Sequence, residues 1–341
     1  MSDLGLHHNS RSRVRPRAAS GVDFKVVAWG SFRSRCYNAT ARITPIKPLL
    51  TKSFTLVDTL LLLFFLCTCG PATSNNQEPV ATQKAEATTP PWLNQDGKTI
   101  STRFVPPEGF VREEYAADKF GSYLQGQSLK PHGTEVRLYS GELKSNQSAH
   151  AAVLNVSVGK RDLQQCADAV MRLRADYLFD QKRFSDIHFN FVSGFKAEYA
   201  RWREGERISV KGNNVRWTPG NGPTPDEAAY GKYLTMVFSY AGTASLIHEL
   251  KPKENQNIEA SDVLIKGSSP GHAVIVVDKA TNPATGETMV LLAQSYMPAQ
   301  DIHVLVNPEH SDGNPWYSVR DFGEMIYTAE YVFYAGALRT W

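Results

Sequence analysis

The sequence has few cysteines and no long apolar segment, and both deficits limit what the chain can be. Four of its 341 residues are cysteine, and Cys166 is the only one that follows residue 69. A disulfide bond within the C-terminal part of the chain is therefore excluded. The most apolar run, Leu60–Leu66, is too short to span a bilayer as a mature helix. No repeat at the spacing of a solenoid is visible.

The excess of positive over negative charge is confined to the N-terminus. The formal net charge is +3, but residues 1–53 carry most of the basic excess, with only Asp3 and Asp23 opposing it. The remainder is slightly acidic and has no basic stripe, which argues against a nucleic-acid partner. A hydrophobic fraction of 42% and a charged fraction of 21% are ordinary for a globular protein.

The N-terminal residues have the pattern of a targeting segment. Residues 1–55 show no periodicity, and we expect them to be unstructured, as an extension from a wrongly assigned start codon. Residues 56–69 read as a signal peptide, with Lys47 and Lys52 as its positive region. The stretch "LCTCG" resembles a bacterial lipobox, which implies that the thiol of Cys69 carries a diacylglycerol. The alternative is a plain secretory signal or membrane anchor whose cysteines are incidental.

The residues that follow fit a tethered domain. Residues 70–100 are rich in Ser, Thr, Asn, Gln, Ala and Pro, so we expect a flexible linker. Residues 101–341 suit one globular domain. We therefore expect a lipoprotein of the bacterial cell envelope that faces the periplasm or the exterior and contacts the membrane through its N-terminal lipid.

The domain is predicted to be α+β, because helices precede a run of antiparallel strands. The periodicity predicts a short helix and turn over residues 113–129 and helices over residues 160–181 and 227–250, the first of these two beginning near residues 159–162. It predicts strands over residues 134–141, 149–158, 261–266, 272–278, 288–295 and 302–306, and over the first half of 187–207. Residues 211–231 read as a loop, and the aromatic tail as a short helix or strand.

Four phrases carry a resemblance to a known family: "LKPHGTEVRLYSG", "DLQQCADAVMRLRADYL", "SPGHAVIVVD" and "LLAQSYMPAQDIHVL". Together they resemble the domain-of-unknown-function 4846 family of bacterial envelope proteins, over residues 103–341. That resemblance implies no particular activity.

A second resemblance is to the papain-like cell-wall peptidases of the NlpC/P60 type. Ala260-Ser261-Asp262 matches the turn before a strand, Gly271-His272 opens the next strand, and Gln294 matches the polar residue that orients the histidine. The resemblance implies a papain-like core, with a helix packed on an antiparallel sheet and an elaborated N-terminal half. His272 would be the base at a strand edge, with one wet face, and Gln294 would fix its tautomer.

The sequence departs from that pattern at the nucleophile. Where the family has a cysteine at the start of a helix, this chain reads Ser239-Tyr240-Ala241-Gly242, and a phenol with a pKa of about 10 is a poor substitute. Cys166 is the other candidate nucleophile. We expect it in the second turn of its helix, on the apolar face, with Asp168 on a solvated face. A small hydrophobic residue of the core remains the alternative interpretation of Cys166.

Two functions stay open. The first is a cysteine peptidase or amidase acting on cell-wall peptides, with Cys166 as nucleophile, His272 as base and Gln294 as orienting residue. The second is a catalytically inactive papain-like scaffold that binds an envelope ligand such as peptidoglycan or a peptide. Ser239, Tyr240 and His303 are its candidate binding residues, and His303 is expected on the opposite face from its neighbours. No cofactor is expected, because no motif spacing supports a metal site.

Overall fold

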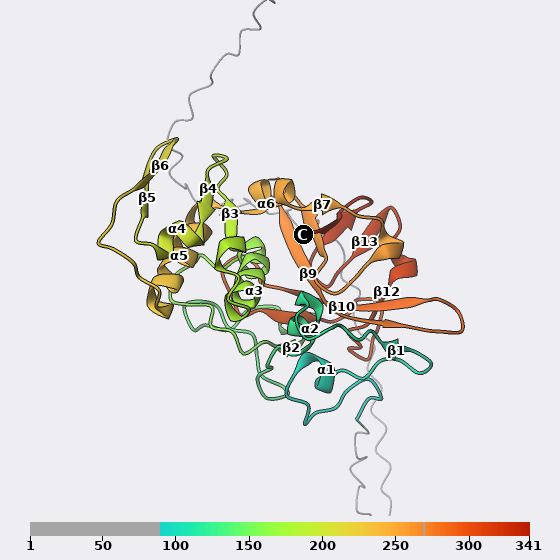
Figure 1. Cartoon of the computed structure of the whole chain (residues 1–341). Helices are drawn as coiled ribbons and strands as arrows, with labels where there is room; N and C mark the ends of the chain where they lie inside the picture. Colours follow the sequence, from blue (N-terminus) through green and yellow to red (C-terminus); the bar gives the residue numbers. More distant parts are fainter. Residues whose placement is uncertain (1–88, 269) are drawn as a thin grey trace, which may run out of the picture. The chain divides into compact units, whose positions relative to one another are not determined.

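A large antiparallel sheet organises the C-terminal part of the chain (Figure 1). The computed structural model describes residues 89–268 and 270–341, which belong to one unit, Ala81–Trp341. Nine strands follow the order β2-β11-β10-β9-β8-β15-β7, with β1 beside β9 and β12 beside β10. They are β1 (Val111–Arg112), β2 (His150–Val153), β7 (Lys251–Pro252), β8 (Val263–Lys266), β9 (His272–Thr281), β10 (Thr288–Gln294), β11 (His303–Leu305), β12 (Tyr317–Ser318) and β15 (Leu338–Thr340).

Helices and three small hairpins surround this sheet (Figure 1). The helices are α1 (Ile100–Arg103), α2 (Phe120–Gln125), α3 (Cys166–Asp180), α4 (Tyr199–Arg203), α5 (Glu227–Tyr240) and α6 (Thr243–Glu249), with 3-10 turns at Gln147–Ala149, Phe184–Asp186, Asn255–Asn257 and Val319–Asp321. The hairpins pair β3 (His188–Asn190) with β4 (Lys196–Glu198), β5 (Arg207–Lys211) with β6 (Asn214–Thr218), and β13 (Met325–Tyr327) with β14 (Val332–Tyr334). The expected α+β class is confirmed.

The sheet is buried on both faces, which explains the continuous apolar runs of β9 and β10. Alternate residues of a strand point to opposite faces. Ile275 and Val277 of β9 belong to the core cluster that α3 completes, and we call this side the helix face. Val274 and Val276 belong to a second cluster with Phe333 of β14 and Ile326 of β13, and we call that side the hairpin face.

The predicted strands of the C-terminal half are confirmed as β8, β9, β10 and β11. The predicted turn before β8 is also present, and Ser261 there has a left-handed backbone with φ of 94°. The expected strand over residues 134–141 is wrong. Only isolated bridges form there, from Arg137 to Leu143 and from Leu138 to Gln300.

Two helix predictions need correction. The helix expected from residues 159–162 begins at Cys166, because Gln165 is its extended N-cap and the Asp168 carboxylate accepts the Gln165 N–H. The helix expected over residues 227–250 is two helices, because Ala241 has an extended backbone that ends α5. Residues 211–231, expected as a loop, contain β6.

Packed structure also extends before the expected domain start at residue 101. Trp92 and Leu93 are buried, and Leu93 bridges to Phe104. Residues 1–55, the signal segment 56–69 with Cys69, and the first part of the expected linker lie outside the described residues. Among residues 89–268 and 270–341, no helix combines the length and apolarity that crossing a bilayer requires.

Candidate functional site

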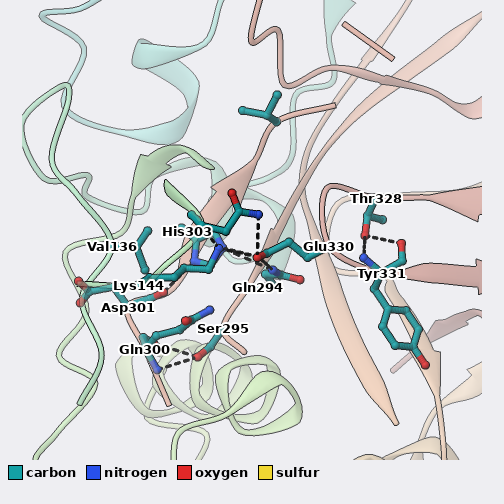
Figure 2. Close-up of polar contacts among 12 residues, drawn as sticks. Val136, Lys144, Gln294, Ser295, Gln300, Asp301, His303, Thr328, Glu330 and Tyr331 are labelled. Carbon is teal, nitrogen blue, oxygen red and sulfur yellow. Dashed lines mark hydrogen bonds and ion pairs between the residues drawn. The ribbon is translucent and has the colours of Figure 1, made fainter. Parts of the chain in front are cut away.

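A polar cluster is buried on the hairpin face, where three neighbouring strands begin or end. His272 is the first residue of β9, Gln294 is the last of β10, and His303 is the first of β11. Gln294 and His303 are direct cross-strand partners. Glu330, between β13 and β14, and Lys144 reach the same point from distant parts of the chain. Figure 2 shows Gln294, His303, Glu330 and Lys144 converging. We call these five residues the polar cluster.

The Gln294 carboxamide joins the two histidines. Its Oε1 lies 2.7 Å from His272 Nε2, and its Nε2 donates to Glu330 Oε2 at 2.8 Å. The same amide nitrogen lies 3.4 Å from His303 Nε2. Because a carboxylate only accepts, the amide N–H must face Glu330 and the amide oxygen must face His272. His272 therefore donates through Nε2–H, and in the neutral ring Nδ1 is the unprotonated nitrogen.

Glu330 stays charged although it is largely buried. Burial alone would raise the pKa of its carboxyl group, but His303 and Lys144 together hold that pKa at about 2. Lys144 Nζ lies 2.7 Å from Glu330 Oε2, and Asn146 Nδ2 donates to Oε1 at 3.2 Å. A carboxylate with this many donors is a fixed acceptor at neutral pH.

His272 has no wet face, contrary to expectation. Its side chain is buried against Tyr296, Tyr331 and Phe333, whose ring centroids lie 4.8, 4.7 and 5.8 Å from the imidazole. Burial lowers the pKa of His272 to about 4, although the Gln294 hydrogen bond acts in the opposite direction. The imidazole is therefore neutral at pH 7.

Cys166 heads α3, which packs against β9 on the helix face (Figure 1). It was expected in the second turn, but it is the first helical residue. Its side chain lines a hollow of about 330 Å³ together with Gly271, Thr243 and Met297. Burial raises the pKa of the Cys166 thiol, while backbone N–H groups, first that of Ala273, lower it.

Cys166 and His272 are close along β9 but face different sides of the sheet. The Cys166 sulfur faces the backbone of Ala273, the residue that follows His272. Because alternate residues of β9 point to opposite faces of the sheet, His272 lies with Val274 on the hairpin face. Among residues 89–268 and 270–341, no hydrogen bond joins the thiol to the imidazole or reaches His272 Nδ1.

Steric crowding explains why the residue before His272, Gly271, is a glycine. A Cβ at Gly271 would overlap the Thr243 hydroxyl and the backbone oxygens of Lys266 and Ser268. The chain therefore passes close to the start of α6 at the point where it enters β9, and only glycine fits. Gly271 also forms part of the wall of the hollow that Cys166 lines.

The structure does not bring Ser239 or Tyr240 to the polar cluster. Both lie at the C-terminal end of α5, where Ser239 Oγ donates to Thr235 O at 2.7 Å. Tyr240 is 40% exposed and its ring packs on Phe191, with centroids 5.3 Å apart. Tyr240 is the last residue of α5, whereas the helix that packs on β9 begins at Cys166.

The predicted face of His303 is confirmed, since Ile302 and Val304 belong to the helix-face core while His303 joins the polar cluster. Asp168 was expected on a solvated face, but it is buried, and burial raises its pKa to about 8. Lys144 and Glu330 were missed, because no local pattern marks them. Tyr296 was also missed, although its position two residues after Gln294 places it on the same face.

No metal site is evident in the part of the chain that the structure describes, because no group of three His, Cys, Asp or Glu side chains is arranged to hold an ion. The neutral His272 and the protonated Cys166 thiol are instead arranged as a potential proton acceptor and a potential nucleophile on either side of one strand end.

Comparison with known proteins gives one match. Residues 100–340 match the family described as domain of unknown function (4846). No curated protein and no solved structure shows a significant match to the chain.

Proposed function

The chain belongs to the domain-of-unknown-function 4846 family, and we propose that it is a cysteine peptidase or amidase of papain-like architecture that acts on cell-wall peptides. Cys166 is the nucleophile, His272 the base and Gln294 the residue that orients the base. The observation that carries the proposal is the position of Cys166. It is the first residue of a 15-residue helix and lines an open hollow where the histidine strand begins.

The helix start favours anionic sulfur chemistry. The first N–H groups of a helix lack intrahelical partners and carry partial positive charge, so they stabilise a nearby thiolate or an oxyanion. The Cys166, Ala167 and Ala273 backbone groups act on the thiol in this sense and lower its pKa against the effect of burial. The same donors are available to the oxygen of a carbonyl group that the sulfur attacks.

The polar cluster favours a base with one defined proton acceptor. Because His272 Nε2–H donates to Gln294 Oε1, a proton from the Cys166 thiol goes to Nδ1. The sulfur then forms a bond to the substrate carbonyl carbon, and the imidazolium returns the proton to the leaving amine as the C–N bond breaks. Water hydrolyses the resulting thioester. Because the thiol and the imidazole lie on different sides of β9, this proton transfer requires that substrate binding bring them within hydrogen-bond reach.

The test is hydrolysis of purified cell-wall peptides by the full chain, followed by mass spectrometry. Replacing Cys166 with Ala removes the sulfur and should reduce the rate at least ~10³-fold, since other nucleophile deletions cost that much or more. Ser239→Ala is the matched control, because Ser239 lies on α5 outside the polar cluster. Hydrolysis that survives the Cys166→Ala change would refute the assignment.

A second candidate is an inactive scaffold of the same architecture that binds an envelope peptide in the hollow beside Cys166. The two pKa shifts favour it, because burial disfavours both the thiolate and the imidazolium in the resting state. This function predicts saturable peptide binding that Cys166→Ala leaves intact, with no bond cleaved over prolonged incubation.

We also propose that lipid attached to Cys69 anchors the domain to the envelope membrane. The support is the lipobox-like sequence alone. Metabolic labelling with a fatty acid should mark the wild-type chain and leave the Cys69→Ala variant unlabelled. Equal labelling of the two would contradict the anchor.

A further inference from the structure

We propose that Glu330 is a positioning residue that locks the Gln294 carboxamide and, through it, fixes His272 as the Nε2–H tautomer. The inference deepens the proposed function and rests on it for its catalytic meaning. The tautomer itself is a property of the folded chain, so it is measurable whether or not the protein is an enzyme.

The amide has one orientation that satisfies both His272 and Glu330. With Oε1 toward His272, one N–H of Gln294 donates to Glu330 at 2.8 Å and the other faces His303 Nε2 at 3.4 Å. His303 is anchored separately, because its Nδ1 donates to the Asp301 carbonyl oxygen at 2.9 Å. The Glu330 carboxylate is therefore the acceptor that fixes the direction of the amide.

The flipped orientation is excluded by charge. A rotated amide would place its oxygen against the Glu330 carboxylate. It would also present N–H to His272 Nε2, which would then have to be the acceptor, and the ring proton would move to Nδ1. That tautomer cannot take a proton from a thiol at Nδ1. The negative charge of Glu330 therefore selects the Nε2–H tautomer of His272, although no hydrogen bond joins these two side chains.

Glu330 is itself held in place from two directions. Lys144 Nζ contacts one carboxylate oxygen at 2.7 Å, and Asn146 Nδ2 contacts the other at 3.2 Å. Lys144 Nζ also donates to the Asn146 carbonyl oxygen at 2.8 Å, so the Lys144 side chain is fixed to the backbone. Figure 2 shows Glu330 between Lys144 and Gln294. Because the side chains of Lys144 and Glu330 are 6% and 13% exposed, water competes little for these contacts.

The experiment is ¹⁵N NMR of the histidine rings in the full chain, with the His272 signal assigned by its loss in a His272→Gln variant. The wild type should show one tautomer, protonated at Nε2. Glu330→Gln keeps the size but lacks the charge, so both tautomers should appear. Glu330→Met also lacks the acceptor and should move the ratio of the two His272 tautomers further from that of the wild type. Glu259→Gln is the matched control, because Glu259 pairs with Tyr115 and Lys279 instead.

Hydrolysis kinetics provide the second readout. Glu330→Gln should lower kcat by about 10–100-fold, with little change in KM. That range is seen when residues that hold metal ligands in place by hydrogen bonds are replaced. A wild-type ring protonated at Nδ1, or a single Nε2–H tautomer that persists in both Glu330 variants, overturns the inference. If the tautomer responds but no peptide is cleaved, the positioning role stands and the proposed function fails.

Discussion

Replacing Gln294 with Leu tests whether the polar cluster is as tightly coupled as its distances indicate. Leu has nearly the volume of Gln, so the change creates little cavity and isolates the loss of polar contacts. Gln294 is fully buried, and its removal leaves His272 Nε2–H and one acceptor position of Glu330 without their partner.

Each loss has a typical cost. A buried neutral donor without a partner costs about 1–3 kcal/mol, and a hydrogen bond to a charged group contributes about 1.5–3 kcal/mol. Together they predict that Gln294→Leu lowers the free energy of unfolding by about 2.5–6 kcal/mol. Urea denaturation followed by circular dichroism measures this from the midpoint and slope.

The matched control is Gln127→Leu. Gln127 is half-buried and its amide makes one hydrogen bond, 3.2 Å long, to the Tyr123 carbonyl oxygen. We expect a change below about 1 kcal/mol there, since that bond exchanges readily with water. If Gln294→Leu also lies within about 1 kcal/mol of the wild type, the cluster is not a coupled network, and the argument for a locked tautomer fails with it.

Two further predictions concern the same strand end. Because burial lowers the folded-state pKa of His272 to about 4 from its ordinary value of 6.5, unfolded chains take up a proton that folded chains do not as the pH falls between these values. As the pH falls from 7 to 5, the free energy of unfolding should therefore decrease by about 2 kcal/mol more in the wild type than in His272→Gln. Urea denaturation at the two pH values measures both decreases. Equal decreases would contradict the burial of a neutral imidazole. Gly271→Ala should lower the unfolding free energy by about 1–3 kcal/mol, because its Cβ would overlap backbone oxygens of Lys266 and Ser268. Gly323→Ala is the matched control, because Gly323 is exposed and has open space around its Cβ position. An unchanged Gly271→Ala midpoint would show that the entry to β9 is loosely packed.

The strands of the C-terminal half could be predicted from the sequence because their apolar runs are bounded by turns. β9 and β10 are buried on both faces, so the central residues of both strands are apolar, and Gln294 stands out at the end of β10. The two-residue steps from Val290 through Leu292 to Gln294 also give its face correctly, since all three lie on the hairpin face.

The start of α3 could not be predicted, because its cap has an unusual composition. Gln165 stands at the N-cap, where Ser, Thr, Asp or Asn is typical, and the reciprocal contact comes from Asp168. The apolar positions before Cys166, such as Leu163, extend the helical periodicity beyond the true start. The prediction therefore placed Cys166 one turn too deep, and Asp168 on the surface.

Lys144 and Glu330 could not be predicted for a different reason. They lie 150 and 36 positions from Gln294 along the chain, and 186 positions separate them from each other. Each is an ordinary charged residue in a turn-rich stretch. Only the pairing of β10 with β11 and the packing of the β13–β14 hairpin on the sheet bring them together.

The most direct test of the account is the rate at which Cys166 reacts with iodoacetamide at pH 7 in the presence of a cell-wall peptide. Peptide mass spectrometry of the full chain separates Cys166 from Cys36, Cys67 and Cys69. If His272 activates Cys166 when substrate binds, the peptide should change the alkylation rate of the wild type, and His272→Ala should abolish that response. An alkylation rate at Cys166 that is the same with and without peptide, and the same in wild type and His272→Ala, would contradict the claim that these two residues act together.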